Sequence, residues 1–393
     1  MGLLRLLLAI AVIIAHSGPL AGIQSVGGDV AVEAFFIISG FYMALVLNGK
    51  YGKGSYGLFL SNRLLRLYPV YWVVVGLTLV VSAVWYVRLG VPLKLGPYQQ
   101  AAGHLGIVGW VGLLVANLII LGQDVLMFVG IDRAGHWHFT SHYAQSFPPV
   151  HQLMFVHQAW SLSLEIIFYL VAPLLVRRQL VILLGVAGSS LLVRLLLYKL
   201  GCYHDPWNYR FFPSELVFFV MGALAYRAYR WLSLRTVSTN LLRLVFGLIV
   251  GFTVLYQFVP GVLGRQIAYY VCLAGALPFV FSYTKDSRWL NKLGELSYPV
   301  YITHVLVLMV APATLAKLHL PQASQTAWVV VASILVSLVL IRYVIEPVER
   351  IRQRRARAAL GNSSAEALAA AAREEISRNP LGSSGKEYGL FSP

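Results

Sequence analysis

Residues 70–87 read VYWVVVGLTLVVSAVWYV, eighteen positions without a charged side chain. A helix needs roughly 20 mostly apolar residues to cross a bilayer core of about 30 Å, and a helix satisfies its own backbone amides where water is absent. Comparable apolar runs recur along the chain, for example at 241–259 and 326–345. One soluble core cannot bury so many runs. The sequence therefore predicts an all-α, polytopic membrane helical bundle.

The composition points the same way. Apolar residues make up 58% of the 393 positions and charged residues only 12%, against about 25% charged in an ordinary soluble domain. The net charge of +16 would suit nucleic acid, but a basic excess in a membrane protein usually marks its cytoplasmic loops, and we expect no nucleic-acid partner. Cys202 and Cys272 are too few for a disulfide framework.

Ten apolar runs have the length of a membrane span. They are 3–19, 30–48, 68–87, 159–176, 180–199, 213–231, 241–259, 266–283, 295–315 and 326–345. The first run follows Arg5, as in a signal peptide, but no Ala-x-Ala site follows it and further spans do, so we expect a retained helix. An eleventh run, 105–122, is rich in glycine and contains Asn117.

The basic residues decide the topology. If 105–122 does not cross the membrane, 23 of the 31 Lys and Arg lie on the side of Arg5 and eight on the other: Arg88, Lys94, Arg133, Arg194, Lys199, Arg210, Arg265 and Lys317. This predicts cytoplasmic termini, a membrane domain at 1–348 and a basic, then Ala-rich cytoplasmic tail at 349–393. Residues 89–158 become an outward region with a re-entrant or surface helix. Ser363 and Glu366 are spaced as a capping box, which predicts a short helix in the tail.

Two ionisable pairs could carry chemistry. Arg5 and His16 are eleven residues apart, about 16 Å along one helical face. Glu33 enters the second span near the depth of His16, where a carboxylate could orient the imidazole and raise its basicity, as a general base requires. Alternatively, His16 is simply solvated near the outer boundary, and Glu33 is an acid at a helix N-terminus that only interacts favourably with the helix dipole.

Arg63 and Arg66 lie three apart on one face near the cytoplasmic boundary. Two guanidinium groups there could clamp the phosphates of a ligand or anchor the helix to lipid phosphates.

The fourth and ninth predicted spans carry further polar residues. Trp160, Ser161 and Glu165 open the fourth, and Glu165 lies about two turns into the membrane, where a carboxylate needs a partner; Arg194 is the candidate. Tyr301 and His304 lie deep in the ninth, and His304 is either catalytic or hydrogen-bonded to a neighbouring helix. The loop histidines have metal-like spacing without a clear partner, so we expect no metal; they are His136, His138 and His142.

Several short motifs in a fixed order resemble those of the acyltransferase-3 family of integral membrane O-acyltransferases. They are Arg5 with His16, VEAFFIISGF at 32–41, RLLRLYP at 63–69, WSLSLE at 160–165 followed by Phe168 and Tyr169, Tyr301 with His304, and Glu346-Pro347. Each is weak alone, but together they cover residues 5 to 347. Glu33 stands where the family usually has aspartate. The C-terminal hydrolase-like domain of some relatives is expected to be absent, because about 46 residues follow Pro347.

The resemblance implies transfer of an acyl group, most often acetyl, from cytoplasmic acyl-CoA to a hydroxyl of a cell-envelope or exported glycan or lipid-linked saccharide. It implies acetyl-CoA or another acyl-CoA as co-substrate, no permanently bound cofactor, and a place among the lipids of a bacterial inner membrane. His16 and Glu33 would be catalytic, and Arg63, Arg66 and Arg5 would hold the CoA phosphates. The remaining candidates would line the acceptor path or stabilise an oxyanion: Trp160, Ser161, Glu165, Tyr301 and His304.

Two other functions suit a bundle with buried charges. A flippase or transporter for an envelope saccharide would move its substrate without forming an ester, and often shows internal repeats that we do not find here. A glycan polymerase or ligase would consume lipid-linked sugar without acyl-CoA. Membranes supplied with labelled acetyl-CoA separate these functions, because only a transferase forms an ester and releases CoA.

Overall fold

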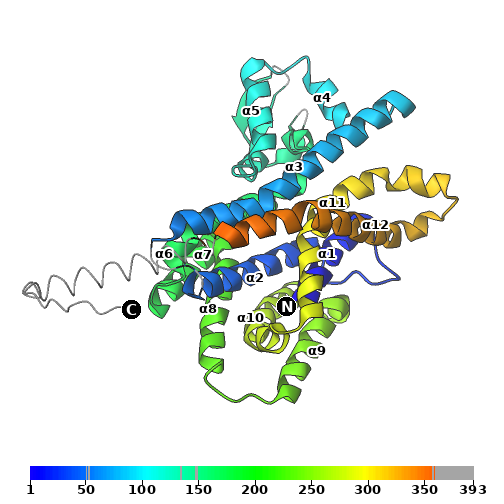
Figure 1. Ribbon diagram of the computed structural model, residues 1–393. Coiled ribbons are helices and arrows are strands. Elements are labelled where there is room, and N and C mark those ends of the chain that lie inside the picture. Colours follow the sequence, from blue (N-terminus) through cyan, green and yellow to red (C-terminus); the bar gives the residue numbers. More distant parts are fainter. Residues whose placement is uncertain (50, 52–53, 133–134, 147–148, 356–357, 359–393) are drawn as a thin grey trace, which may run out of the picture.

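The computed structural model describes residues 1–393 apart from 50, 52–53, 133–134, 147–148, 356–357 and 359–393. The predicted tail helix at Ser363 and Glu366 lies outside these residues. The described α-helices are α1 (Gly2–Ser17), α2 (Gly28–Gly49), α3 (Tyr56–Leu89), α4 (Gly96–Ala101), α5 (Ile107–Leu118), α6 (Trp160–Leu175), α7 (Leu180–Lys199), α8 (Phe212–Leu232), α9 (Thr239–Leu255), α10 (Val262–Thr284), α11 (Arg288–Lys317) and α12 (Gln325–Leu340) (Figure 1).

Short helical turns connect or extend several of these helices. They are η1 (Leu93–Leu95), η2 (Val125–Phe128), η3 (Tyr143–Gln145), η4 (Val150–Leu153), η5 (His157–Ala159), η6 (Tyr256–Phe258) and η7 (Gln322–Ser324), with a π-helical segment, η8 (Ile341–Ile345), after α12. Two antiparallel strands, β1 (Val129–Ile131) and β2 (Trp137–Phe139), form a hairpin in which Gly130 pairs with His138. The sequence did not predict this hairpin.

Each of the ten predicted spans falls on a helix. In the described part of the chain, eight helical segments are long and apolar enough to cross a membrane, which confirms a multi-pass helical bundle. The other two predicted spans are α1, which has 16 residues, and α8, whose 21 residues include Glu215 and Arg227. Crossing by α1 and α8, and the side on which the termini lie, stay predictions.

The region between α3 and α6 forms a separate small cluster. Figure 1 shows α4 and α5 together at the top of the picture, away from the helices that run through the centre. The 12 residues of α5 span about 18 Å, less than the thickness of a bilayer core. Its buried Asn117 accepts a hydrogen bond from the Phe155 amide and donates to the Leu153 carbonyl, so the segment is fixed to the start of the next membrane helix.

Two helix pairs approach until their backbones touch. A Cβ placed on Gly2 of α1 would lie 1.5 Å from the Leu290 carbonyl oxygen of α11, and one on Gly294 would lie 2.9 Å from the Gly2 Cα. A Cβ on Gly40 of α2 would lie 1.9 Å from the Phe219 oxygen of α8. In lipid, where apolar association alone gains little, such small residues permit the close contact that holds helices together.

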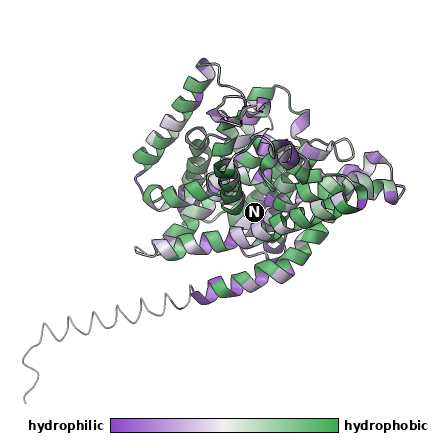
Figure 2. Ribbon diagram, turned by 90° about the horizontal axis from the view of Figure 1, so that it is seen from above, coloured by the Kyte–Doolittle hydropathy of each residue, from purple (hydrophilic) through white to green (hydrophobic). Residues whose placement is uncertain are grey.

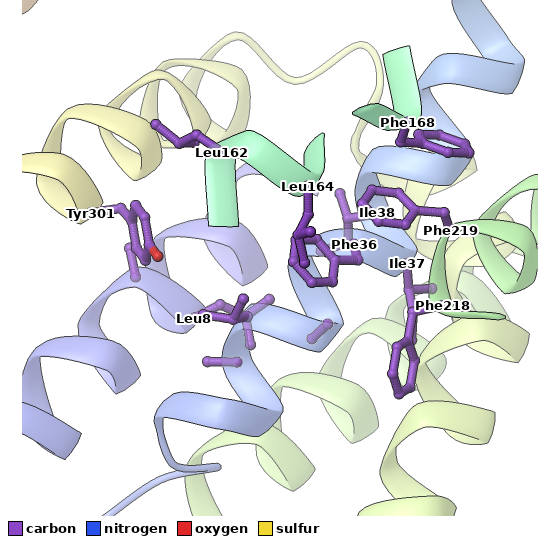
Figure 3. Close-up of a cluster of buried hydrophobic side chains, with 14 of the residues drawn as sticks. Leu8, Phe36, Ile37, Ile38, Leu162, Leu164, Phe168, Phe218, Phe219 and Tyr301 are labelled. Atoms are coloured by element: carbon purple, nitrogen blue, oxygen red, sulfur yellow. The ribbon is translucent and has the colours of Figure 1, made fainter. Parts of the chain in front are cut away.

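Aromatic stacking completes the contact of α2 and α8 with α6. The ring of Phe219 stacks on Phe36 at 4.7 Å and on Phe168 at 4.3 Å between centroids. Figure 3 shows these rings with Ile38 and Leu164 in one buried cluster, and Tyr301 at its edge near Leu162. The cluster therefore joins three helices around the centre of the bundle.

The outer faces of the helices are apolar. Val80, Leu192, Leu248 and Val271 are each more than half exposed, as expected for side chains in contact with lipid. In Figure 2 the helices are mostly green, and purple residues gather in connections and toward helix ends.

We predict that Gly294→Ala destabilises the protein, because the added methyl group overlaps the α1 backbone and overpacking of this kind costs about 1–3 kcal/mol. Gly185→Ala in α7 is the matched control, since a Cβ there meets nothing within 4 Å. Thermal unfolding in detergent should show a lower midpoint for the first variant alone. Equal midpoints would contradict the contact between α1 and α11.

Candidate active site

Two histidines from opposite ends of the chain face each other. The rings of His16 on α1 and His304 on α11 have centroids 5.1 Å apart. The pair follows from the contact at Gly2 and Gly294, because α1 and α11 then run in the same direction toward these residues. The sequence placed both imidazoles in the membrane, but did not predict that they pair.

Backbone carbonyls fix the tautomer of both rings. His16 Nδ1 lies 2.8 Å from the Val12 oxygen, and His304 Nδ1 lies 2.5 Å from the Tyr301 oxygen. Because a carbonyl oxygen only accepts, each Nδ1 donates its proton and each Nε2 of the neutral ring keeps a lone pair. The Nε2 of His304 is buried and has no hydrogen-bond partner among the described residues. Each ring thus keeps one nitrogen lone pair that these backbone hydrogen bonds do not use.

His16 lines a cavity of about 520 Å³, here called the histidine cavity. Its other polar lining comes from several helices and loops: Asp29, His157, Gln158, Trp160, Tyr209, Arg210, Arg265, Gln266 and Tyr301. Carboxylate, amide and guanidinium groups beside aromatic faces can bind a polar ligand that has both hydroxyl groups and apolar ring faces.

Arg210 is fixed at the rim of this cavity by an ion pair. Its Nε lies 2.7 Å from an Asp205 oxygen, and its guanidinium stacks on the Trp160 ring at 4.2 Å. Burial opposes the charge, but the hydrogen bonds and the charge of Asp205 raise the pKa of Arg210 above its ordinary value. Arg210 is therefore a permanent cation that positions Trp160, one of the residues singled out in the sequence.

The predicted phosphate-binding arginines come together in a second cavity. Arg5, Arg63 and Arg66 line a space of about 190 Å³, here called the arginine cavity. Arg63 is nearly buried, and its guanidinium lies 5.7 Å from the centroid of the Phe59 ring. Because Arg5 and His16 are three turns apart on α1, this one helix presents its arginine to one cavity and its histidine to the other.

Glu165 also lines the arginine cavity, and the predicted partner for it is wrong. Its Oε1 accepts hydrogen bonds from Ser39 Oγ at 2.8 Å and from the Tyr169 hydroxyl at 2.5 Å. Arg194 instead lies on α7 against α2 and α8. In the described structure the carboxylate of Glu165 is thus hydrogen-bonded by hydroxyl groups. One of them, that of Ser39, lies on another helix, and a contact between helices cannot be predicted from one sequence.

Glu33 does not partner His16 within the described residues, contrary to the prediction. One Glu33 oxygen lies 3.0 Å from Arg194 Nη2, and the other accepts a hydrogen bond from the Tyr270 hydroxyl. Arg194 also pairs with Glu215 at 2.5 Å, so two buried carboxylates share one guanidinium. A buried carboxylate requires such a partner, and the face of α2 that carries Glu33 turns toward α7, α8 and α10.

Asp29 takes the place expected for Glu33, because it lines the histidine cavity together with His16. It precedes Glu33 by one helical turn, at the first turn of α2. Asp29 was not among the predicted site residues; the signal for it in the sequence was a second acid at the start of the same helix.

Hydroxyl groups connect α6 with α11 between the two cavities. Ser161 Oγ lies 2.7 Å from the Tyr301 hydroxyl, and each of the two oxygens lies 3.1 Å from the Gln158 carbonyl oxygen, so one hydroxyl donates to the other and the other donates to this carbonyl. Ser161 and Tyr301 line the arginine cavity, and Tyr301 lines the histidine cavity as well. Their pairing across the bundle was not predicted.

The loop histidines do not assemble into a metal site in the part of the chain that the structure describes, where no three His, Cys, Asp or Glu side chains gather for one. His136 pairs with Asp132 at 3.4 Å, and the rings of His142 and His204 lie 4.4 Å apart. Cys202 and Cys272 are free thiols.

The comparisons with known proteins identify the family. The family model described as an acyltransferase domain, acyltransferase 3, matches residues 1–345. No curated protein and no solved structure matches the chain. The family match covers most of the chain and confirms the resemblance of its motifs. With its repeated apolar helices, the chain therefore belongs to the acyltransferase 3 family and is a multi-pass membrane acyltransferase.

Proposed function

We propose that this protein is an O-acyltransferase that moves an acyl group, acetyl in the first place, from acyl-CoA to a hydroxyl of a cell-envelope or exported glycan or of a lipid-linked saccharide. One observation carries the proposal. A cavity lined by three arginines and a cavity lined by His16 have two lining side chains in common, Val32 and Tyr301. This arrangement suits a polyanionic donor on one side and a hydroxyl acceptor on the other.

Arg63, Arg66 and Arg5 are proposed to bind the phosphates of CoA from the cytoplasm. Guanidinium groups pair with phosphate oxygens through two parallel hydrogen bonds, so a cluster of three suits the pyrophosphate and 3′-phosphate of CoA. The predicted topology supports entry of CoA from the cytoplasm, because it places the Arg5 end of α1 on the side of the membrane that has most of the Lys and Arg residues.

His16 is the proposed general base. Its Nε2 takes the proton of the acceptor hydroxyl while the hydroxyl oxygen forms a bond with the thioester carbon. The C–S bond then breaks, and the CoA thiolate leaves and takes that proton from His16. Attack by His16 itself, which would form an acyl-histidine, is the alternative route.

The neighbours of His16 have different proposed roles. With its Nδ1 donating to the Tyr301 carbonyl, neutral His304 can only accept at Nε2, so its proposed role is to accept a hydrogen bond beside His16, and it cannot donate to an oxyanion. The hydroxyl groups of Tyr301 and Ser161 can donate and suit the developing oxyanion. Asp29, in the cavity of His16, suits stabilisation of its charged form.

Loss of the base is the first test. We predict that His16→Ala lowers kcat/KM for acyl transfer by about 10²- to 10⁴-fold, because a positioned base contributes that much. The control His136→Ala removes an imidazole that is 79% exposed in a loop, and should leave transfer unchanged. Labelled acetyl transfer to membrane glycans measures both. Normal ester formation by His16→Ala at equal protein level would overturn the mechanism.

Donor binding is the second test. We predict that Arg63→Gln and Arg66→Gln each raise the KM for acetyl-CoA about tenfold or more, since a charge-assisted hydrogen bond contributes about 1.5–3 kcal/mol. Arg243→Gln, an exposed arginine of α9, is the control. The KM for the acceptor should stay unchanged. An unaltered KM for acetyl-CoA in both variants would exclude this phosphate site.

Glu33 provides the third test, because the structure gives it a packing role. We predict that Arg194→Leu destabilises the protein by about 3–5 kcal/mol, since it leaves two carboxylates buried without a cation. Adding Glu33→Gln and Glu215→Gln to that variant should restore much of the thermal midpoint in detergent. A midpoint that Arg194→Leu leaves unchanged would show that the three charges do not hold the helices.

A further inference from the structure

The arginine cavity and the histidine cavity have two lining residues in common. Val32 and Tyr301 line both of them. Val32 is a small side chain of α2 with few rotamers, so it cannot swing far from its helix. Of these two shared side chains, the phenol ring of Tyr301 is the larger and the one that can rotate out of the way.

Hydrogen bonds and ring contacts hold Tyr301 in its present position. Its hydroxyl lies 2.7 Å from Ser161 Oγ and 3.1 Å from the Gln158 carbonyl oxygen. Its ring lies edge-on to Phe35, with centroids 6.2 Å apart, and 5.9 Å from the ring of His304. Only 7% of the residue is exposed. The bonds join neutral groups, and such bonds in membrane proteins are weak enough to exchange.

We propose that Tyr301 is the partition between a donor chamber and an acceptor chamber, and that its ring admits only a short acyl group to His16. This inference rests on the proposed function in one respect: the group that passes the ring is taken to be the acyl end of a thioester held at the arginines. The phenol must turn aside to let the acyl carbon reach the histidine cavity. With the ring in place, water from the acceptor side is kept from the thioester, which limits hydrolysis of the donor.

The partition is tested by thiol labelling, which needs no acyl transfer. Cys202 and Cys272 are replaced by serine, and Ala15→Cys supplies a reporter in the histidine cavity. A membrane-impermeant trimethylammonium methanethiosulfonate is then added from one side of oriented vesicles. We expect Ala15→Cys to react from the acceptor side alone while Tyr301 is present. Tyr301→Ala should make it reactive from the arginine side too, at least about tenfold faster than before.

Two controls accompany this experiment. Met43→Cys lines the arginine cavity and should react from the arginine side with either residue at 301. Tyr301→Phe keeps the ring, so in this variant Ala15→Cys should still react from the acceptor side alone. The partition would be overturned if reagent added from the arginine side labelled Ala15→Cys equally fast with Tyr301 present and with Tyr301→Ala. This outcome does not depend on whether the protein uses acyl-CoA.

Acyl-chain preference tests the size limit. Tyr301→Ala is expected to raise the ratio of kcat/KM for hexanoyl-CoA to that for acetyl-CoA about tenfold or more, because space is added along the path of the chain. Tyr301→Phe should leave the ratio near the wild-type value. An unchanged ratio in an alanine variant that still transfers acetyl would contradict the size limit, and the labelling result would stand independently of it.

Discussion

The close approach of α1 to α11 is the constraint on which the site depends. Gly2 and Gly294 leave no room between the two backbones, and from that contact both helices run toward the middle of the bundle. His16 and His304 therefore meet although 288 positions separate them in the chain. In lipid the apolar effect does not select one helix partner over another, so contact between small residues has to do it. The contact between the two imidazole rings follows from that packing.

A second constraint is the cost of charge inside the bundle. Arg194 of α7 forms ion pairs with two buried carboxylates, Glu33 of α2 and Glu215 of α8, and so holds α7 against this helix pair. Asp29, one turn before Glu33 on α2, lines the histidine cavity, and Val32, next to Glu33, lines both cavities. One helix thus contributes an ion pair to the packing and two side chains to the proposed acyl path.

Much of this architecture could be predicted from the sequence, because membrane helices are read from apolar length alone. The spacing of Arg5 and His16, and of Arg63 and Arg66, also depends only on helical periodicity; the structure shows Arg5, Arg63 and Arg66 lining one cavity and His16 another, a division that the spacing did not predict. Contacts between helices could not be predicted. The partners of Glu33 and Glu165 depend on which helices pack together, and one sequence contains no information on that choice. The hairpin of β1 and β2 was missed because its three-residue strands carry no clear period.

The proposed reaction requires that a donor held by the arginines reaches His16 past Tyr301. A structure determined with a non-hydrolysable ketone analogue of acetyl-CoA tests it directly. The account predicts phosphates against Arg63 and Arg66, a displaced Tyr301 ring, and the ketone carbon close enough to His16 Nε2 for an acceptor hydroxyl to lie between them, about 3.5 Å from each. An analogue whose acyl end stays in the arginine cavity, or lies outside both cavities, would contradict the account.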